Sequence, residues 1–435
     1  MESLLHYVWK HRLYDENSLL TGDGQRFEII DTGIYNIHAG PDFFNAKIKI
    51  GDKLWAGNVE IHNLSSDWYR HRHDSDKAYN SVIFHVAESL DTSEIRDESG
   101  RVIPQWEMKF PQIIRDNYQF LLESDSQIPC IGRIREISEI YLSDWKAALL
   151  TERLERKAND IFSLLKTYKN DWNEVFYIIL SRNFGFNVNN DAFERLAKSL
   201  PLKIILKNSQ FSIQSEALFL GQAGLLDEEE NGDNYYNSLR KGYIFLQKKY
   251  KLTPLEKHTF KNLRIRPNNF SLIKIVQLAG IICNRQGLFS ELIGISEEQD
   301  MRNFFASDIN EYWKTHYQFG KISSCREKKL GFSAISLLMI NVVSAMFFAY
   351  GKRKNKPEYT EKALQLLETI RAEQNYIVKQ FVRAGILMNN AGDSQAIIQL
   401  KREYCEKKKC IYCRIGHQLL AKDSSDTTVP REQYH

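Results

Sequence analysis

The sequence has few cysteines, little net charge and no long apolar run at its start. Six cysteines in 435 residues are far too few for a disulfide scaffold. A net charge of +4 is too small to indicate nucleic-acid binding by itself, so such binding would need a local basic patch. The first residues, MESLLHYVWKHRLYDE, do not read as a secretory signal. We therefore expect a soluble, cytoplasmic protein.

Composition and length indicate a globular protein with two or three domains, because 435 residues exceed one ordinary core. Residues 330–350 test the expectation of solubility, since they carry no formal charge and are long enough to cross a membrane. Three serines and an asparagine interrupt this segment, and the sequence has no second one like it. We expect a buried central helix and no membrane partner.

The apolar pattern changes along the chain and predicts an α+β fold class. Residues 1–125 are expected to form a mixed α/β sheet domain, and residues 138–420, where the apolar period becomes 3.6, a large all-α domain. Residues 421–435 are polar and are expected to be a disordered tail. Within the first domain, strands are predicted at residues 26–31, 46–50, 54–62 and 81–87, with helices at 3–12 and 111–122 and a helix or ordered loop at 65–79.

Two acidic residues lie around a predicted hairpin whose turn is Gly51-Asp52-Lys53. Side chains alternate along a strand, so Glu60 and His62 share one face. Asp42 lies where the chain enters the first hairpin strand, and the hairpin could bring it close to Glu60. Two carboxylates and a base form a minimal Mg²⁺ or Mn²⁺ site for phosphodiester hydrolysis. We therefore predict Asp42 and Glu60 as metal ligands and His62 as the residue that positions or deprotonates water.

This arrangement resembles the restriction-endonuclease-like, or PD-(D/E)XK, nuclease superfamily. The core of that superfamily runs helix, three strands, helix, strand, with an acid at the second strand and E-x-K on the third. Pro41-Asp42 and Glu60-x-His62 fall at those positions, so the resemblance implies a restriction-endonuclease-like core and a nuclease active site. His62 departs from the pattern, because a neutral histidine does not supply the permanent charge of lysine. A degenerate, non-catalytic module that binds nucleic acid or protein therefore stays open as an alternative.

Histidines are concentrated in the first 85 residues. His71 and His73 would share a face if the chain is extended there. With His62, Asp67 and His85 they form an alternative zinc or iron site, which would indicate a histidine-rich metalloenzyme of other chemistry. No HExxH motif is present, and any single histidine here is more readily explained as a surface or hydrogen-bonded core residue.

Three of the six cysteines crowd together near the C-terminus, in the spacing Cys405-x4-Cys410-x2-Cys413. Such spacing lets thiolates from one turn reach one metal. His417 would complete a zinc site with these three thiolates. An iron–sulfur cluster would instead take a remote fourth ligand, from Cys130, Cys325 or Cys283. Zinc, an iron–sulfur cluster and unmetallated thiols all remain open.

Basic residues provide the candidates for contact with nucleic acid. Arg264, Arg266, Lys352 and Arg353 could bind phosphates, although charge runs are more often simply solvated faces. The sequence does not indicate a particular substrate or protein partner. A metal-dependent nuclease is the first hypothesis that the residues support.

The whole chain also resembles an uncharacterised bacterial family, number 2851 in the series of domains of unknown function. The resemblance implies a cytoplasmic bacterial protein and assigns no activity. It rests on Gly40-Pro41-Asp42-Phe43, residues 57–62, Asp67-Trp68 with His71 and His73, Ile128-Pro129-Cys130, residues 264–270, Tyr350-Gly351 and residues 410–416.

Overall fold

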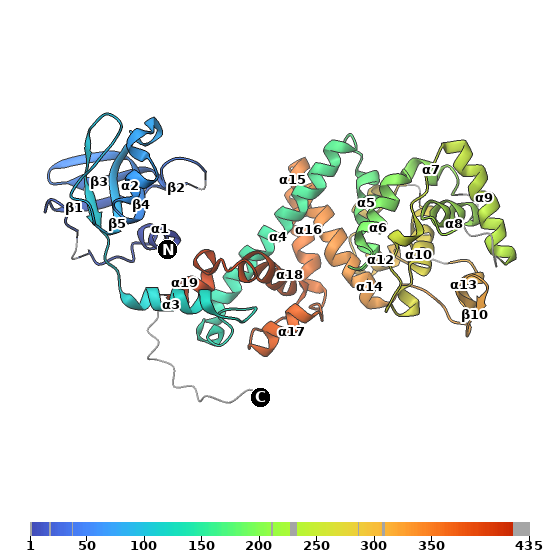
Figure 1. Cartoon of the computed structure of the whole chain (residues 1–435). Helices are drawn as coiled ribbons and strands as arrows, with labels where there is room; N and C mark the ends of the chain where they lie inside the picture. Colours follow the sequence, from blue (N-terminus) through green and yellow to red (C-terminus); the bar gives the residue numbers. More distant parts are fainter. Residues whose placement is uncertain are drawn as a thin grey trace. The chain divides into compact units, whose positions relative to one another are not determined.

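The computed structural model describes residues 2–16, 19–36, 38–209, 212–226, 233–285, 287–306 and 309–420 (Figure 1). The chain divides into two compact units, Met1–Leu142 with Leu400–His435, and Ser143–Gln399. The first unit is therefore built from two stretches of sequence, which the second unit separates. The expected boundary near residues 125–138 is close to the first exit, but residues 400–420 belong with the first unit and not with the helical one. The expected tail, 421–435, lies outside the described residues.

The first unit holds a mixed sheet with helices before and after it. Its elements up to the exit are α1 (Glu2–Lys10), β1 (Phe27–Asp31), β2 (Ile34–Tyr35), β3 (Phe43–Ile50), β4 (Lys53–Leu64), α2 (Asp67–Arg70), β5 (Val82–Ser89), β6 (Ile95–Arg96), β7 (Val102–Ile103), β8 (Gln105–Glu107) and α3 (Gln112–Glu123). After the return come a π-helical turn (Leu400–Cys405), a 3-10 turn (Cys410–Tyr412) and α19 (Arg414–Leu420). The strands and helices predicted for this unit are confirmed, with small shifts at their ends.

The main sheet has the order β1-β3-β4-β5-β8, and β2 also pairs with β3. The pairs β1/β3 and β3/β4 are antiparallel, whereas β4/β5 and β5/β8 are parallel. Gly51, at φ +55°, supplies the left-handed conformation for the tight turn between β3 and β4. Residues 65–81 make the crossover from β4 to β5 and carry α2 and two 3-10 turns, His73–Ser75 and Lys77–Tyr79.

The second unit is mostly helical, as the change of period predicted. α4 (Glu139–Thr167) leads from the first unit into it. The other elements are α5 (Trp172–Phe184), α6 (Asn190–Ser199), α7 (Leu202–Leu206), α8 (Ser212–Gln222), α9 (Asn234–Tyr250), α10 (Ser271–Cys283), α11 (Leu288–Ile293), α12 (Glu298–Phe304), α13 (Tyr312–Thr315), β9 (His316–Gln318), β10 (Lys321–Ile322), α14 (Phe332–Leu338), a π-helical turn (Met339–Val343), α15 (Ser344–Lys354), α16 (Pro357–Thr369), α17 (Tyr376–Arg383) and α18 (Ala391–Gln399).

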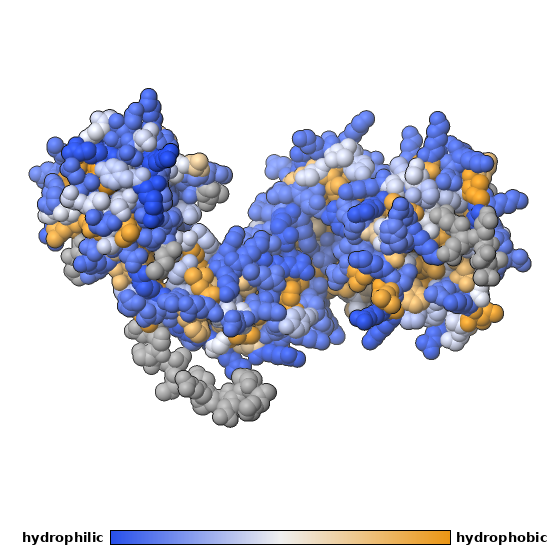
Figure 2. Space-filling view, in the orientation of Figure 1, coloured by the Kyte–Doolittle hydropathy of each residue, from blue (hydrophilic) through white to orange (hydrophobic). Residues whose placement is uncertain are grey.

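The apolar segment of the second unit forms one continuous helix, Phe332–Lys354, which by length and composition could cross a membrane. Within its most apolar window, 61% of the residues are buried inside the unit. Met339, Val343 and Phe347 are completely buried in the apolar core. Hydrophilic side chains predominate on the face drawn in Figure 2. These observations fit the central core helix that the sequence predicts.

Candidate metal centre

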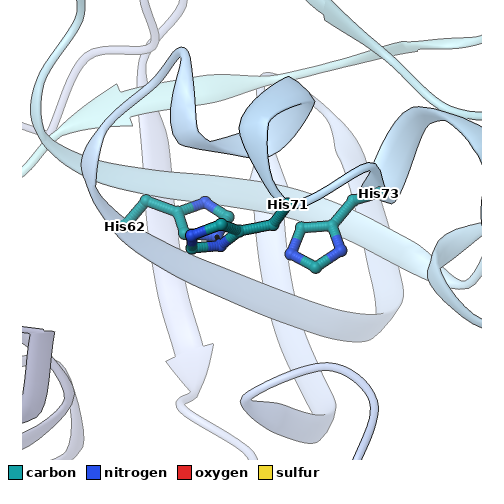
Figure 3. Close-up of side chains that lie close together, drawn as sticks. All are labelled: His62, His71 and His73. Atoms are coloured by element: carbon teal, nitrogen blue, oxygen red, sulfur yellow. Dashed lines mark hydrogen bonds between the residues drawn. The ribbon is translucent and has the colours of Figure 1, made fainter.

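Three histidines converge beside the sheet of the first unit (Figure 3). His62 comes from β4, His71 follows the last turn of α2, and His73 begins the next 3-10 turn. One ring nitrogen of each lies within 4.8 Å of the other two. His62 Nε2 is 3.2 Å from His71 Nδ1, and the rings of His62 and His73 stack at 5.3 Å. This is the histidine set that the sequence offered as an alternative to the two carboxylates.

The short crossover after β4 explains why His71 and His73 face back toward the strand. Asp67 fixes its start, since its Oδ2 accepts from the Leu64 amide at 3.2 Å and its backbone oxygen accepts from the His71 amide at 2.8 Å. Arg72 then takes the left-handed conformation, at φ 62°, and reverses the chain. Asp67 therefore positions the crossover and is not among the three converging ligands.

Glu60 places a carboxylate oxygen beside two of the three histidines. Its Oε1 lies 3.4 Å from His73 Nε2 and 3.7 Å from His62 Nε2. Ligands of a tetrahedral zinc ion, with bonds of 2.0–2.1 Å, stand about 3.3 Å apart. The distances from Glu60 Oε1 to these two nitrogens, and from His62 Nε2 to His71 Nδ1, are therefore close to those of a zinc site. The Nε2 atom of His73 is buried and makes no hydrogen bond, so an ion at this position would satisfy it.

A second layer of side chains holds the ligands. His62 Nδ1 is hydrogen-bonded to His85 Nε2 at 2.8 Å, the contact by which proteins orient a metal-bound imidazole. Trp68 is completely buried, and its ring lies 5.3 Å from that of His73 and 5.7 Å from that of His85. Tyr79 stacks on His73 at 3.7 Å. The sequence predicted His85 as a possible ligand, whereas its hydrogen bond to His62 Nδ1 puts it behind His62.

Asp42 and Glu60 come together, as the predicted hairpin requires. The Asp42 amide donates to Glu60 Oε2 at 3.0 Å, and Asp42 Oδ2 accepts from the Ile61 amide at 2.9 Å. Asp42 Oδ2 also lies 3.1 Å from His6 Nε2. The sequence reasoning did not single out His6, because it comes from α1 and no spacing links it to the hairpin. These contacts make one continuous polar cluster from α1 to the crossover.

Burial controls the ionisation of this cluster. Desolvation, followed by the charge of Asp42, raises the pKa of Glu60 to about 9. Desolvation, followed by the neighbouring histidines, lowers the pKa of His62 to about 2, and burial lowers that of His85 to about 3. Neutral imidazole is the form that binds metals. A divalent ion would also reverse the effect on Glu60, because a nearby cation favours the carboxylate.

Four of the candidate cysteines also lie in the first unit, outside the histidine cluster, whereas Cys283 and Cys325 lie in the second unit. Cys405, Cys410 and Cys413 are buried near the chain's return, as is Cys130 after α3. The ring of His417 instead packs 4.7 Å from that of His11 and 5.6 Å from that of Tyr7.

The four basic candidates for phosphate contact lie in the second unit. Arg264, Arg266, Lys352 and Arg353 are all exposed. Lys352 Nζ is 3.4 Å from a Glu155 carboxylate oxygen, so part of its charge has a partner. The structure therefore brings Asp42, Glu60, His62, His71, His73 and His85 into one cluster, and it places the basic residues in the other unit.

The family model described as "Protein of unknown function (DUF2851)" matches residues 2–376. The chain belongs to this family. The matched region includes the histidine cluster and Cys130, and it ends before Cys405. Membership in the family was predicted from the sequence and is confirmed, but the family description assigns no activity. No curated protein and no solved structure matches the chain.

Proposed function

We propose that the protein is a metal-dependent phosphodiesterase that acts on nucleic acid, with the histidine cluster as its metal centre. The observation that carries the proposal is the meeting of His62, His71 and His73, with Glu60 Oε1 at ligand spacing from two of them. Nitrogen donors favour zinc or another imidazole-binding transition metal over magnesium. Zinc therefore takes the place of the Mg²⁺ or Mn²⁺ that two carboxylates alone would have favoured.

The substrate class is inferred from the position of the cluster in the sheet. Asp42 precedes β3, and Glu60 and His62 lie on β4, the last antiparallel strand before the crossover and the parallel β5. The PD-(D/E)XK resemblance implies a similar order of elements and acidic residues, and β2 is an additional short strand here. The correspondence supports a phosphodiester as the substrate.

Each residue of the cluster has a distinct role in this proposal. A bound zinc ion would polarise a phosphoryl oxygen and lower the pKa of a coordinated water. His62 acts as a ligand and not as the base, because its Nδ1 is engaged by His85. Glu60 Oε1 accepts the proton of the attacking water from its place between His62 and His73. His6, held against Asp42, lies on a more open side of the cluster and donates a proton to the leaving oxygen.

The second candidate function is a non-catalytic binding module with a structural ion. Glu60, His62 and His73 are at most 7% exposed, and four protein ligands would close a zinc site. His71 is the exposed member of the set. If water reaches the metal from the side of His71, the site can be catalytic; if it does not, the ion is structural. In the module, Glu60 occupies the fourth ligand position; in the enzyme, water does.

The test uses the full-length protein, stripped with a chelator and reloaded separately with Zn²⁺, Mn²⁺ or Mg²⁺. Hydrolysis of single-stranded DNA, double-stranded DNA and RNA is followed for each form. We expect zinc or manganese to restore cleavage of at least one substrate, and His73→Ala to abolish it. The control is His258→Ala, a histidine of the second unit whose side chain is 81% exposed. Cleavage that survives in His73→Ala would refute the proposal, and zinc binding without cleavage of any substrate would favour the binding module.

A further inference from the structure

Four buried cysteines of the first unit come from two stretches that are far apart in sequence. Cys130 follows α3, whereas Cys405, Cys410 and Cys413 lie on the returning stretch before α19. All four are at most 9% exposed, and none is in a disulfide. The histidine site does not use them. The burial of four thiols from both stretches of this unit therefore needs an explanation other than the histidine site.

Hydrogen bonds hold the two stretches side by side. The buried Lys401 Nζ donates to the Gln127 carbonyl, three residues before Cys130. Lys408 Nζ donates to the Ser124 carbonyl at 3.2 Å. Figure 1 shows α3 beside α19, and Asn117 Nδ2 of α3 donates to the Leu420 carbonyl at 3.1 Å. These contacts bring Cys130 to the segment that carries the other three cysteines.

The turn that carries Cys410 is packed tightly against the first turn of α19. The Cys413 amide donates to the Cys410 carbonyl at 3.2 Å, as in a 3-10 turn. A Cβ atom on Gly416 would stand 2.0 Å from that carbonyl oxygen, closer than two atoms can approach. Glycine at position 416 therefore allows α19 to start directly against the cysteine turn, and the backbone fixes where Cys410 and Cys413 lie.

The four thiols are electrostatic neighbours. Burial raises the pKa of Cys405, and the thiols of Cys130, Cys413 and Cys410 raise it further. Burial and Cys413 raise the pKa of Cys410 to about 11. Lys401 and Lys408 lie near enough to oppose part of the effect at Cys405 and Cys410, respectively.

The spacing of the sulfurs distinguishes between metals. One zinc ion with Zn–S bonds of 2.3 Å holds its sulfurs about 3.8 Å apart. The four cysteines all belong to the described residues, yet no three of their sulfurs form a group within 4.8 Å, the spacing that the three histidines meet. A cluster of several irons separates its cysteine ligands more widely, because each sulfur binds a corner of the cluster and not a common centre.

We propose that Cys130, Cys405, Cys410 and Cys413 bind an iron–sulfur cluster that joins the two stretches of the first unit. Such a cluster would link the stretch that precedes the second unit in the sequence to the stretch that follows it. Its role is structural, since all four ligands are buried, as are the apolar residues Ile128, Ile411 and Ile415 close to them in sequence. The inference is independent of the proposed phosphodiesterase activity.

Metal analysis of the full chain, purified without oxygen, tests the proposal. We expect iron and acid-labile sulfide in equal amounts, together with the broad visible absorption of a cluster. Cys130→Ser and Cys405→Ser should each remove most of the iron, whereas Cys283→Ser and Cys325→Ser, in the second unit, should not. His62→Ala with His73→Ala should leave iron and sulfide unchanged. Zinc without sulfide, no metal in the wild-type protein, or full iron in Cys130→Ser would each overturn the proposal.

A glycine pair tests the same site without changing a ligand, which matters if a cysteine variant fails to fold. Gly416→Ala should displace the Cys410 turn and lower the iron content. Gly132→Ala, close to Cys130, should have no such effect, since a Cβ atom there meets nothing within 4 Å. Equal iron in both variants, each shown by circular dichroism to be folded, would contradict the proposed position of the cluster.

Discussion

Two glutamates, one in each unit, are equally buried and have opposite surroundings. Glu60 and Glu216 are both 5% exposed, and burial raises the pKa of each. Glu216 Oε2 accepts from Trp313 Nε1 at 2.8 Å and from the Tyr235 hydroxyl at 2.7 Å. Glu60 Oε1 instead faces ring nitrogens of His62 and His73 that are neutral at ordinary pH. Burial alone therefore does not separate a structural carboxylate from a functional one.

The difference lies in the polarity of the neighbours. Glu216 is surrounded by donors, so its hydrogen-bonding needs are met by the protein. Glu60 Oε2 accepts from the Asp42 amide, but its Oε1 faces imidazole nitrogens, where a bound cation would stabilise the carboxylate form. We therefore assign Glu60 to the metal centre and Glu216 to the support of the helical core.

The largest effect should come from removing two ligands of the centre at once. His62→Ala with His73→Ala leaves too few donors for tight binding, and we expect the rate of phosphodiester hydrolysis to fall by about 10³-fold or more, the several kcal/mol that a metal contributes. Hydrolysis rates and bound zinc, measured on the same preparation, check this. A double variant that keeps both would remove the basis for assigning Glu60 to a metal centre.

The direct test of the comparison is the matched pair Glu60→Gln and Glu216→Gln. Both changes keep the shape of the side chain and replace the ionisable carboxyl with an amide. Glu60→Gln should lower the hydrolysis rate by about 10²-fold, the lower end for loss of a general base, with little change in thermal stability. Glu216→Gln should leave the rate unchanged and destabilise the protein by about 1 kcal/mol through weaker hydrogen bonds. Thermal unfolding and kinetics of both variants are measured together; similar losses of rate would show that the two carboxylates do not differ as argued.

A smaller effect is expected when the ligands stay and only their support is removed. His85→Gln takes away the partner of His62 Nδ1 and should weaken zinc binding by about 10- to 100-fold. Competition with a coloured chelator measures the affinity. His38→Gln, at an exposed position of the same unit, is the control and should bind zinc as the wild type does. Unchanged affinity in His85→Gln would mean that His62 is held by other contacts.

The hairpin geometry was predictable from sequence, because strand periodicity and the Gly51 turn are local. They predicted that Glu60 and His62 share one face and that Asp42 lies close to Glu60. In the structure, the Asp42 amide donates to Glu60 Oε2. His71 and His73 were recognised by residue type, but their convergence depends on the left-handed Arg72. His6 was missed because α1 reaches Asp42 only through the tertiary fold.

Long-range assembly explains what the sequence could not reveal. Periodicity placed residues 400–420 in the predicted all-α domain, because it carries no information about which unit a helical segment joins. Three remote cysteines could supply the fourth ligand of the proposed cluster. Cys130 is selected because hydrogen bonds such as that from Lys401 to the Gln127 carbonyl bring its stretch of chain to the other three cysteines. Such pairings follow from packing between distant segments, and no spacing motif encodes them.

The smallest effect concerns the donors around Glu216. Trp313→Phe keeps the ring in the core and removes the Nε1 donor, while the Tyr235 hydroxyl still bonds the same oxygen. We expect a loss of about 1 kcal/mol in the free energy of unfolding, at the low end for a buried acceptor that loses one of two partners. Tyr235→Phe should cost a similar amount. Neither variant should alter zinc content or hydrolysis, because Glu216 belongs to the unit without the histidine cluster. If either one lowered the hydrolysis rate at unchanged stability, the carboxylate of the helical unit would have a part in function, and the distinction between the two glutamates would fail.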